Sequence, residues 1–235
     1  MPEKARPNSP RIKRRLIIAI DGPAGSGKST TAKALARRLR IPYIDSGAMY
    51  RALTLAAVEK KVSFRDKPAL VRLAKQCEIG LEADPGRAQR VFLDGKDVTR
   101  RIRLPELTSK VFAVAQIPAI RRELVGKQRR LGLRRGGVME GRDIGTVVFP
   151  GADYKFFFVA KEAIRAKRRH RELLASGARA GFSRVLRDMQ KRDRTDRTRR
   201  EGPLKRAKDA VLIDTTSLTI SQTVDRILRF LAHAR

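Results

Sequence analysis

The clearest chemical signature in this sequence is a glycine-rich stretch near the N-terminus. Residues 22–29 read GPAGSGKS, which matches the pattern G-x-x-x-x-G-K-[ST]. In such a loop the backbone N–H groups surround a phosphate, the lysine bridges the β- and γ-phosphates, and the following hydroxyl ligates Mg²⁺. We therefore expect a nucleoside triphosphate site, with Lys28 at the β- and γ-phosphates and Ser29 as the Mg²⁺ ligand, although the loop alone leaves the reaction open. The expected ATP-binding residues are Gly22, Pro23, Ala24, Gly25, Ser26, Gly27, Lys28, Ser29 and Thr30.

Arginines at three other places could neutralise a second phosphate. An enzyme that phosphorylates an anionic acceptor must bring two polyanions together, and arginine suits this task because its guanidinium is planar, always charged and bidentate. Ser46 and Arg51 follow one predicted strand, and Arg142 follows another within the sequence GRD. Further charged residues recur at intervals of one to three, so several should share one side of a helix: Arg192, Asp193, Asp196 and Arg199.

The elements around the glycine-rich loop predict an α/β fold. Residues 16–20, LIIAI, form a continuous apolar run of the kind found in a parallel strand that is buried on both faces. Apolar residues at helical spacing follow the loop. Further buried strands are expected at 43–44, 137–140, 154–159 and 210–214, separated by helical stretches. Strands that alternate with helices favour a parallel sheet whose ligands gather beyond the carboxyl ends of the strands.

Two segments depart from this alternation. Residues 78–82 and 90–93 read as short strands, and Asp94-Gly95 is a strong hairpin turn signal, so we expect an inserted β-containing subdomain at about 62–105. Residues 161–200 hold fifteen Lys and Arg against five acids. The C-terminal helix is predicted to begin with a capping box formed by Thr219 and Gln222.

These motifs together resemble the bacterial cytidylate kinases, a family of nucleoside monophosphate kinases. The matching stretches lie in order along nearly the whole chain: the phosphate loop, then residues 43–57, 117–124, 136–153 and 192–216. The resemblance implies a P-loop kinase fold, in which a parallel five-stranded sheet is flanked by helices. It also implies that residues 16–235 form a single kinase domain, with the insert at 62–105 as the monophosphate-binding subdomain and the basic stretch at 161–190 as a helical lid.

The activity implied by the resemblance is transfer of the γ-phosphoryl group of ATP to CMP or dCMP, with Mg²⁺, in pyrimidine nucleotide metabolism. By position, Ser46, Arg51, Arg142 and Arg199 match the residues that hold the acceptor phosphate in this family. Arg121 and Asp143 match those that read the cytosine, while Arg192 and Asp196 match those at the sugar. The residues expected to be catalytic are Lys28, Arg142, Arg192 and Arg199.

One position departs from the family pattern. Six residues before Pro118, the family usually has a serine that helps to contact the base, whereas this chain has Phe112. A phenylalanine cannot form that hydrogen bond, although it can stack or shape a pocket.

Composition limits the remaining possibilities. The chain has 235 residues with 55 Lys and Arg against 24 Asp and Glu, which gives a net charge of +31 and favours anionic partners. No apolar run approaches the roughly 20 residues of a membrane span, so we expect a cytoplasmic protein without membrane contact. We also expect a monomer. The single cysteine, Cys77, allows no intramolecular disulfide. Residues 1–15 carry six basic residues and three prolines, which predicts a disordered tail that could bind polyanions nonspecifically.

Two alternatives remain open at this stage. The charge would also suit a P-loop ATPase that binds nucleic acid, although aromatic residues, which stack on bases, are only 5% of the chain. The same kinase fold could instead act on another acceptor, such as UMP, AMP or a non-nucleotide. Asp143 argues for cytosine, because uracil presents a carbonyl where cytosine presents an amine.

Overall fold

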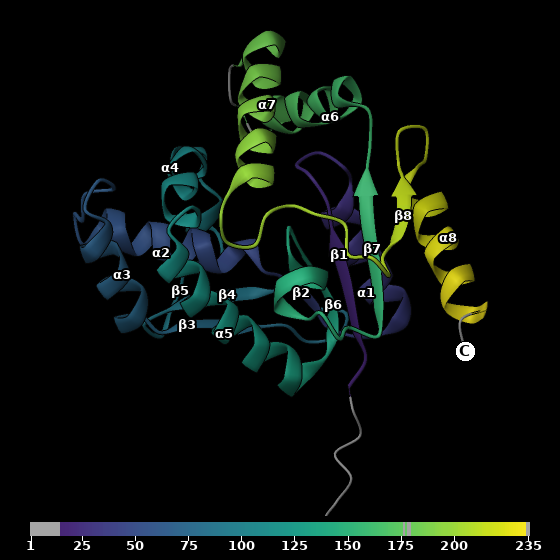
Figure 1. The fold of residues 1–235 in the computed structure, drawn as a ribbon, viewed down its shortest axis with the longest axis horizontal. Coiled ribbons are helices and arrows are strands. Elements are labelled where there is room, and N and C mark those ends of the chain that lie inside the picture. Colours follow the sequence, from purple (N-terminus) through teal and green to yellow (C-terminus); the bar gives the residue numbers. More distant parts are fainter. Residues whose placement is uncertain (1–14, 176, 178–179, 234–235) are drawn as a thin grey trace, which may run out of the picture.

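The central feature of the fold is a five-stranded parallel sheet (Figure 1). The structure is a computed structural model that describes residues 15–175, 177 and 180–233. The strand order is β2-β6-β1-β7-β8, and every neighbouring pair is parallel. The strands are β1 (Ile17–Asp21), β2 (Tyr43–Asp45), β6 (Gly137–Gly141), β7 (Tyr154–Val159) and β8 (Val211–Asp214). All five predicted strands are therefore present, with ends that differ by at most one residue.

Both faces of the sheet are covered, as the continuous apolar run in β1 predicts. Ile18 and Ile20 pack into a core with α1 (Lys28–Leu39) and α8 (Ile220–His233). Ile17 and Ala19 point the other way, into a larger core with α2 (Gly47–Glu59) and α5 (Pro118–Arg135). Successive side chains of a strand alternate between its faces, so a strand between two helical layers must be apolar throughout.

The predicted β-containing insert is a second, antiparallel sheet. It comprises β3 (Ile79–Glu82), β4 (Arg90–Leu93) and β5 (Lys96–Asp97), and it follows α3 (Lys67–Gln76). Asp94 and Gly95 have φ of 48° and 78°, the left-handed conformation that a tight hairpin requires. The two-residue strand β5 was not predicted, because Lys96 and Asp97 are both exposed and carry no apolar pattern. A 3₁₀ turn, Arg101–Arg103, and α4 (Pro105–Ala115) lead from this sheet to α5.

Two basic helices follow β7 and lie beside one another above the sheet (Figure 1). They are α6 (Glu162–Ala175) and α7 (Phe182–Thr198), and they share a small apolar core of Ala166, Val185 and Met189. The helix α7 continues through the charged run that begins at Arg192. The basic tail predicted at 1–15 lies outside the described residues except for Arg15, and no described helix is long and apolar enough to cross a membrane.

The C-terminal helix α8 begins with the predicted capping box. The backbone N–H of Thr219 donates to Oε1 of Gln222 at 2.9 Å, and the backbone N–H of Gln222 donates to Oγ1 of Thr219 at 3.2 Å. The reciprocal bonds satisfy donors that the helix itself leaves open. This capping box fixes the start of the helix that covers β8 and α1.

Candidate active site

The glycine-rich loop joins the end of β1 to the start of α1, as predicted. Gly25 has φ of 71°, and a Cβ there would lie 2.7 Å from the carbonyl oxygen of Arg165, so only glycine fits. The Oγ of Ser26 donates to the carbonyl of Pro23 at 2.9 Å and holds the loop closed on itself. The N-terminus of α1 thus follows directly on the loop, which is the arrangement that binds phosphate.

Two arginines of α6 hold the carbonyl side of this loop. Arg165 donates through Nη1 to the carbonyl of Ala24 at 3.1 Å, and Arg168 donates to that of Gly25 at 3.5 Å. Arg165 also forms a 2.5 Å ion pair with Asp193 of α7, with both side chains less than a tenth exposed. One guanidinium therefore connects the phosphate loop with both basic helices.

Lys28 is a buried cation that faces carboxylates. Its side chain is 7% exposed, and its Nζ lies 3.8 Å from Oε2 of Glu140 and 3.4 Å from the carbonyl oxygen of Pro23. Burial, and secondly the charge of Arg142, lower its pKa to about 8, although Glu140 opposes this change. The other carboxylate oxygen of Glu140 accepts a 2.8 Å hydrogen bond from the Tyr43 hydroxyl. A lysine held in this way has little freedom to move away from a bound phosphate.

The residues predicted to bind the acceptor surround one cavity of about 490 Å³, beside the carboxyl ends of β1, β2 and β6. Lys28, Ser29 and Thr30 line the same cavity, whereas loop residues 22–27 do not. The eight predicted acceptor-site residues on its wall are Ser46, Arg51, Arg121, Arg142, Asp143, Arg192, Asp196 and Arg199. The fold thus brings together residues that are up to 153 positions apart, from Ser46 to Arg199.

Hydrogen bonds orient several side chains of this cavity. Ser46 immediately precedes α2, and its hydroxyl donates to the carbonyl oxygen of Glu140 at 2.8 Å. Asp196 of α7 accepts from Nε of Arg142 at 3.0 Å and from Nη1 of Arg199 at 3.2 Å. These contacts, with Arg142 first, hold the pKa of Asp196 below its usual value despite its burial. A single carboxylate therefore positions two of the four arginines expected to hold the acceptor phosphate or sugar.

The other two arginines carry charge that the cavity does not fully compensate. Burial and the charge of Arg142 lower the pKa of Arg192 to about 10, and burial also lowers the pKa of Arg51. Depressed guanidinium pKa values are the sign of desolvated positive charges that repel one another. A dianionic phosphate in this cavity would relieve both effects.

The predicted base-reading pair, Arg121 and Asp143, lines the same cavity, and Arg199 links it to Asp196. Nη2 of Arg121 lies 2.5 Å from Oδ2 of Asp143, and Nη2 of Arg199 lies 3.6 Å from Oδ1. The ring of Tyr50 lies under the Arg121 guanidinium, 5.5 Å from its carbon. Gly202 closes over the pair, with φ of 56°, and a Cβ there would overlap the Asp143 carboxylate.

Phe112 does not line this cavity. It lines a neighbouring, more apolar cavity of about 440 Å³ between α4 and the two basic helices, together with Leu173, Val185 and Met189. Val111 and Ala115 of α4 line the acceptor cavity instead. Phe112, the residue that departs from the family pattern, therefore faces α6 and α7 and not the cavity that Arg121 and Asp143 line.

Three acidic residues of this region were not singled out from the sequence. Asp21 accepts hydrogen bonds from the backbone N–H groups of Ile144 and Gly145 at 2.8 and 2.7 Å, and burial raises its pKa to about 7. Asp45 and Glu140 line the acceptor cavity. All three lie at or beside the carboxyl ends of adjacent parallel strands, which is the signal that could have found them.

The cavity offers oxygen ligands that suit a magnesium ion. Mg²⁺ prefers carboxylate, hydroxyl, water and phosphate oxygens, and it is usually bound by one or two protein groups together with substrate phosphates. The Ser29 hydroxyl lies in the first turn of α1 and lines the cavity together with the carboxylates of Asp45 and Glu140. The residues present therefore fit the ion that the phosphate loop predicts.

Comparisons with known proteins show which family the sequence matches. A model of the cytidylate kinase family matches residues 18–233. The chain is 48% identical over 217 residues to a cytidylate kinase of Geobacillus sp., and the alignment covers 92% of this chain and 96% of that protein. It is 47% identical over 210 residues to a cytidylate kinase of Caldanaerobacter subterraneus, with 89% and 92% covered.

Among solved structures, an uncharacterized protein from Eubacterium ventriosum superposes with a TM-score of 0.53 at 13% identity, with 93% and 99% of the two chains covered. That likeness concerns the fold alone. The family match and the two relatives extend over the sheet, the phosphate loop and the acceptor cavity described above. The chain belongs to the cytidylate kinase family.

Proposed function

We propose that this protein transfers the γ-phosphoryl group of ATP to CMP or dCMP and releases ADP with CDP or dCDP. The observation that carries the proposal is the single cavity in which Lys28 of the phosphate loop faces the eight acceptor-site residues. Donor and acceptor phosphates would meet there, beyond the carboxyl ends of the parallel strands. The enzyme would work as a cytoplasmic monomer.

The chemistry needs positioning and charge neutralisation more than covalent catalysis. Phosphoryl transfer passes through a loose transition state with charge on the equatorial oxygens, so no general base is required of the protein. Lys28 would hold the β- and γ-phosphates. Ser46 and Arg51 would hold the acceptor phosphate, while Arg142 and Arg199 would neutralise charge between the two nucleotides. Arg192 would add a buried cation from the side of α7.

Magnesium would be held by the Ser29 hydroxyl and the phosphate oxygens of ATP. A bound ion would neutralise part of the charge on the donor phosphates. Asp45 and Glu140 are close enough to the cavity to orient water molecules around it.

Asp143 would select cytosine. Its carboxylate can accept a hydrogen bond from the exocyclic amine of cytosine, and the same carboxylate would face the carbonyl of uracil. Arg121 holds Asp143 in place and donates from the same side of the cavity. A buried carboxylate that faces an acceptor is costly, so UMP should be the poorer substrate.

The experiment that tests the proposal measures ADP release from Mg-ATP with CMP, dCMP, UMP, AMP or single-stranded RNA supplied separately. Release driven by CMP and dCMP is expected, and the Lys28→Ala variant should lose most of it while its circular dichroism stays native. Release driven only by UMP or AMP would move the acceptor assignment but keep the fold. Release stimulated by RNA alone would contradict the kinase proposal and favour a nucleic-acid-dependent ATPase.

A further inference from the structure

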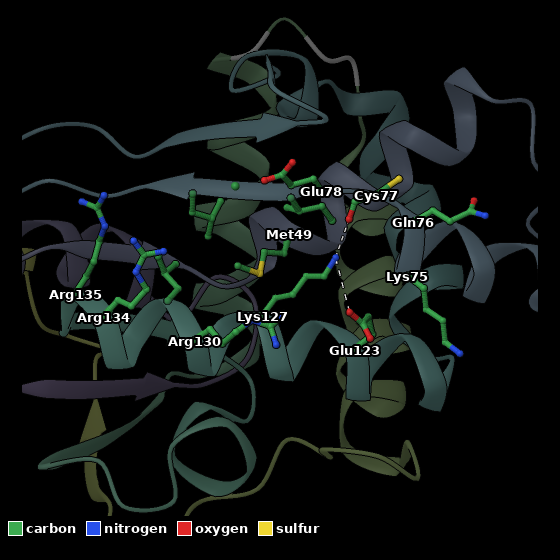
Figure 2. Close-up of a pocket in the computed structure, with 14 residues that line it drawn as sticks. Met49, Lys75, Gln76, Cys77, Glu78, Glu123, Lys127, Arg130, Arg134 and Arg135 are labelled. Carbon is green, nitrogen blue, oxygen red and sulfur yellow. Dashed lines mark hydrogen bonds and ion pairs between the residues drawn. The ribbon is translucent and has the colours of Figure 1, made fainter.

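A second cavity, of about 610 Å³, lies away from the acceptor site and shares no lining residue with it. It is lined by residues of α5, of β3 and of the end of α3 (Figure 2). Its wall carries five cations, Lys75, Lys127, Arg130, Arg134 and Arg135, against two carboxylates, Glu78 and Glu123. We call this set of seven charged residues and the cavity between them the basic groove.

The cations of the basic groove form a row. Figure 2 shows Lys127, Arg130, Arg134 and Arg135 along α5, with Lys75 across from them at the other end. At a rise of 1.5 Å per residue, the eight steps from Lys127 to Arg135 span about 12 Å along the helix axis. Arg130 and Arg134 are four positions apart, so their side chains lie on the same side of the helix. The row suits a linear anion better than a compact one.

Two of the five cations bind groups of the protein itself. Lys127 donates to the carbonyls of Cys77 at 2.7 Å and Ala74 at 3.3 Å, where it satisfies the end of α3. Arg135 forms a 2.6 Å ion pair with Asp84. These contacts hold the walls of the basic groove together without any ligand.

The other three cations lack a carboxylate partner in the described part of the chain. Within the described part of the chain, Lys75, Arg130 and Arg134 are exposed, and no carboxylate lies within ion-pairing distance of their nitrogens. Like charges on one helix face repel one another, so the row itself stabilises nothing in the folded chain. These three cations are therefore available to an anion from outside the chain.

We propose that the basic groove binds the phosphate backbone of a single-stranded polynucleotide. A groove favours a narrow strand over a flat membrane, and arginine binds phosphate bidentately. The walls hold no aromatic residue on which bases could stack, so binding should be independent of base sequence and should depend steeply on salt. This inference concerns a surface apart from the kinase site and does not depend on the proposed activity.

The test uses the full chain and a fluorescein-labelled single-stranded RNA of about 20 nucleotides, with fluorescence anisotropy from about 50 to about 200 mM NaCl. The groove variant is Arg130→Glu/Arg134→Glu. The matched control is Arg226→Glu/Arg229→Glu, which reverses the same charge at two exposed arginines of α8. All three proteins are also assayed for kinase turnover, because none of these arginines belongs to the acceptor cavity.

The groove variant should bind the RNA about tenfold more weakly, and its plot of log K against log salt should be shallower by about 1.4, the loss of two phosphate contacts on a single strand. The control should change much less, and turnover should stay the same in all three. An equal loss of RNA affinity in both variants would overturn the proposal, because it would show that RNA responds to the overall positive charge and not to the basic groove. Unchanged binding in the groove variant would assign the RNA contact to another part of the chain, such as the basic tail.

A membrane partner is distinguished by a second probe, vesicles with an anionic phosphatidylglycerol surface. The proposal expects the groove variant and the control to sediment equally with these vesicles. Loss of vesicle binding in the groove variant, with RNA binding retained, would overturn the polynucleotide assignment and make the basic groove a lipid contact.

Discussion

The Arg121 guanidinium and the Asp143 carboxylate form an ion pair at 2.5 Å in the interior of the protein, where both side chains are less than a tenth exposed. The two residues come from α5 and from the loop after β6, which are 22 positions apart in the chain. Removing one partner of such a buried pair leaves an uncompensated charge and costs far more than the pair itself contributes. The pair is therefore a point where specificity and stability can both be measured.

Asp143→Asn should reduce the preference for CMP over UMP. The neutral amide can donate to the uracil carbonyl and loses a charged hydrogen bond to cytosine, which is worth about 1.5–3 kcal/mol or roughly a ten- to hundredfold change in the ratio of kcat/KM values. Asp196→Asn is the matched control, because it makes the same change at a cavity carboxylate that binds Arg142 and Arg199 but not Arg121, and it should lower both activities without changing their ratio. A ratio that stays constant in Asp143→Asn would show that another group reads the base.

The activity should fall at alkaline pH because Lys28 loses its proton. Burial lowers its pKa to about 8, so the lysine is charged below that pH and neutral above it. The value of kcat/KM for ATP reports the free enzyme and should decline above about pH 8. Lys28→Arg keeps its charge, so the decline should vanish in that variant even if its activity is lower. A decline of the same shape in Lys28→Arg would assign the titration to another group.

Deprotonation of Lys28, which should lower activity, should raise the stability of the fold. Its folded pKa of about 8 lies below the unfolded value of 10.5, so between these values the unfolded chain binds more protons and stability rises with pH. Below about pH 8 the buried charge costs about 3 kcal/mol. Urea unfolding at pH 7 should therefore show Lys28→Met to be more stable than the wild type, and equal stability would mean that the charge is well compensated.

The Arg165–Asp193 ion pair should couple the phosphate loop to the basic helices. Arg165→Met leaves Asp193 without its 2.5 Å partner and removes the bond to the Ala24 carbonyl, so it should cost about 3–5 kcal/mol and raise the KM for ATP. The double variant Arg165→Met/Asp193→Leu should recover most of the stability, as measured by urea unfolding, because it leaves no buried charge. The KM for ATP should stay high in the double variant, because the bond from Arg165 to the phosphate loop is still absent. A normal KM would mean that this bond does not affect ATP binding.

Phe112→Ser should leave the choice of base unchanged. The Phe112 side chain faces the apolar cavity beside α6 and α7, whereas its neighbour Val111 faces the acceptor cavity. The ratio of kcat/KM for CMP and UMP should stay within about twofold of wild type in Phe112→Ser, well below the cost of a lost hydrogen bond. Val111→Ser is the paired variant, in which a new hydroxyl enters the acceptor cavity and should alter the KM for CMP. The reverse pattern would mean that Phe112 turns toward the base in the complex.

Deletion of residues 1–12 should leave the kinase activity intact. The segment precedes β1, and the composition of the basic tail predicts no packed structure. Steady-state turnover with CMP should match that of the full chain. A large loss of kcat would mean that the tail contributes to the site.

The sequence alone predicted the features that depend on local pattern. The buried strands followed from apolar runs such as residues 16–20, because a strand between two helical layers is apolar on both faces. The phosphate loop followed from glycine spacing, and the start of α8 followed from Thr219 and Gln222. The weakly patterned strand β5 was missed, because Lys96 and Asp97 are both exposed and carry no apolar pattern.

The acceptor residues were predicted by resemblance to a family, and their assembly is a property of the tertiary structure. Ser46, Asp143 and Arg199 lie in distant segments, and only the parallel order β2-β6-β1 with α7 above it brings them to one cavity. Which way Phe112 faces, and which arginines are paired, depended equally on packing, because side chains of one residue type serve different roles in different surroundings. The sequence therefore determined the elements and the loop chemistry through local backbone preferences, whereas charge pairing, burial and pKa changes arose only when distant segments displaced water from one another.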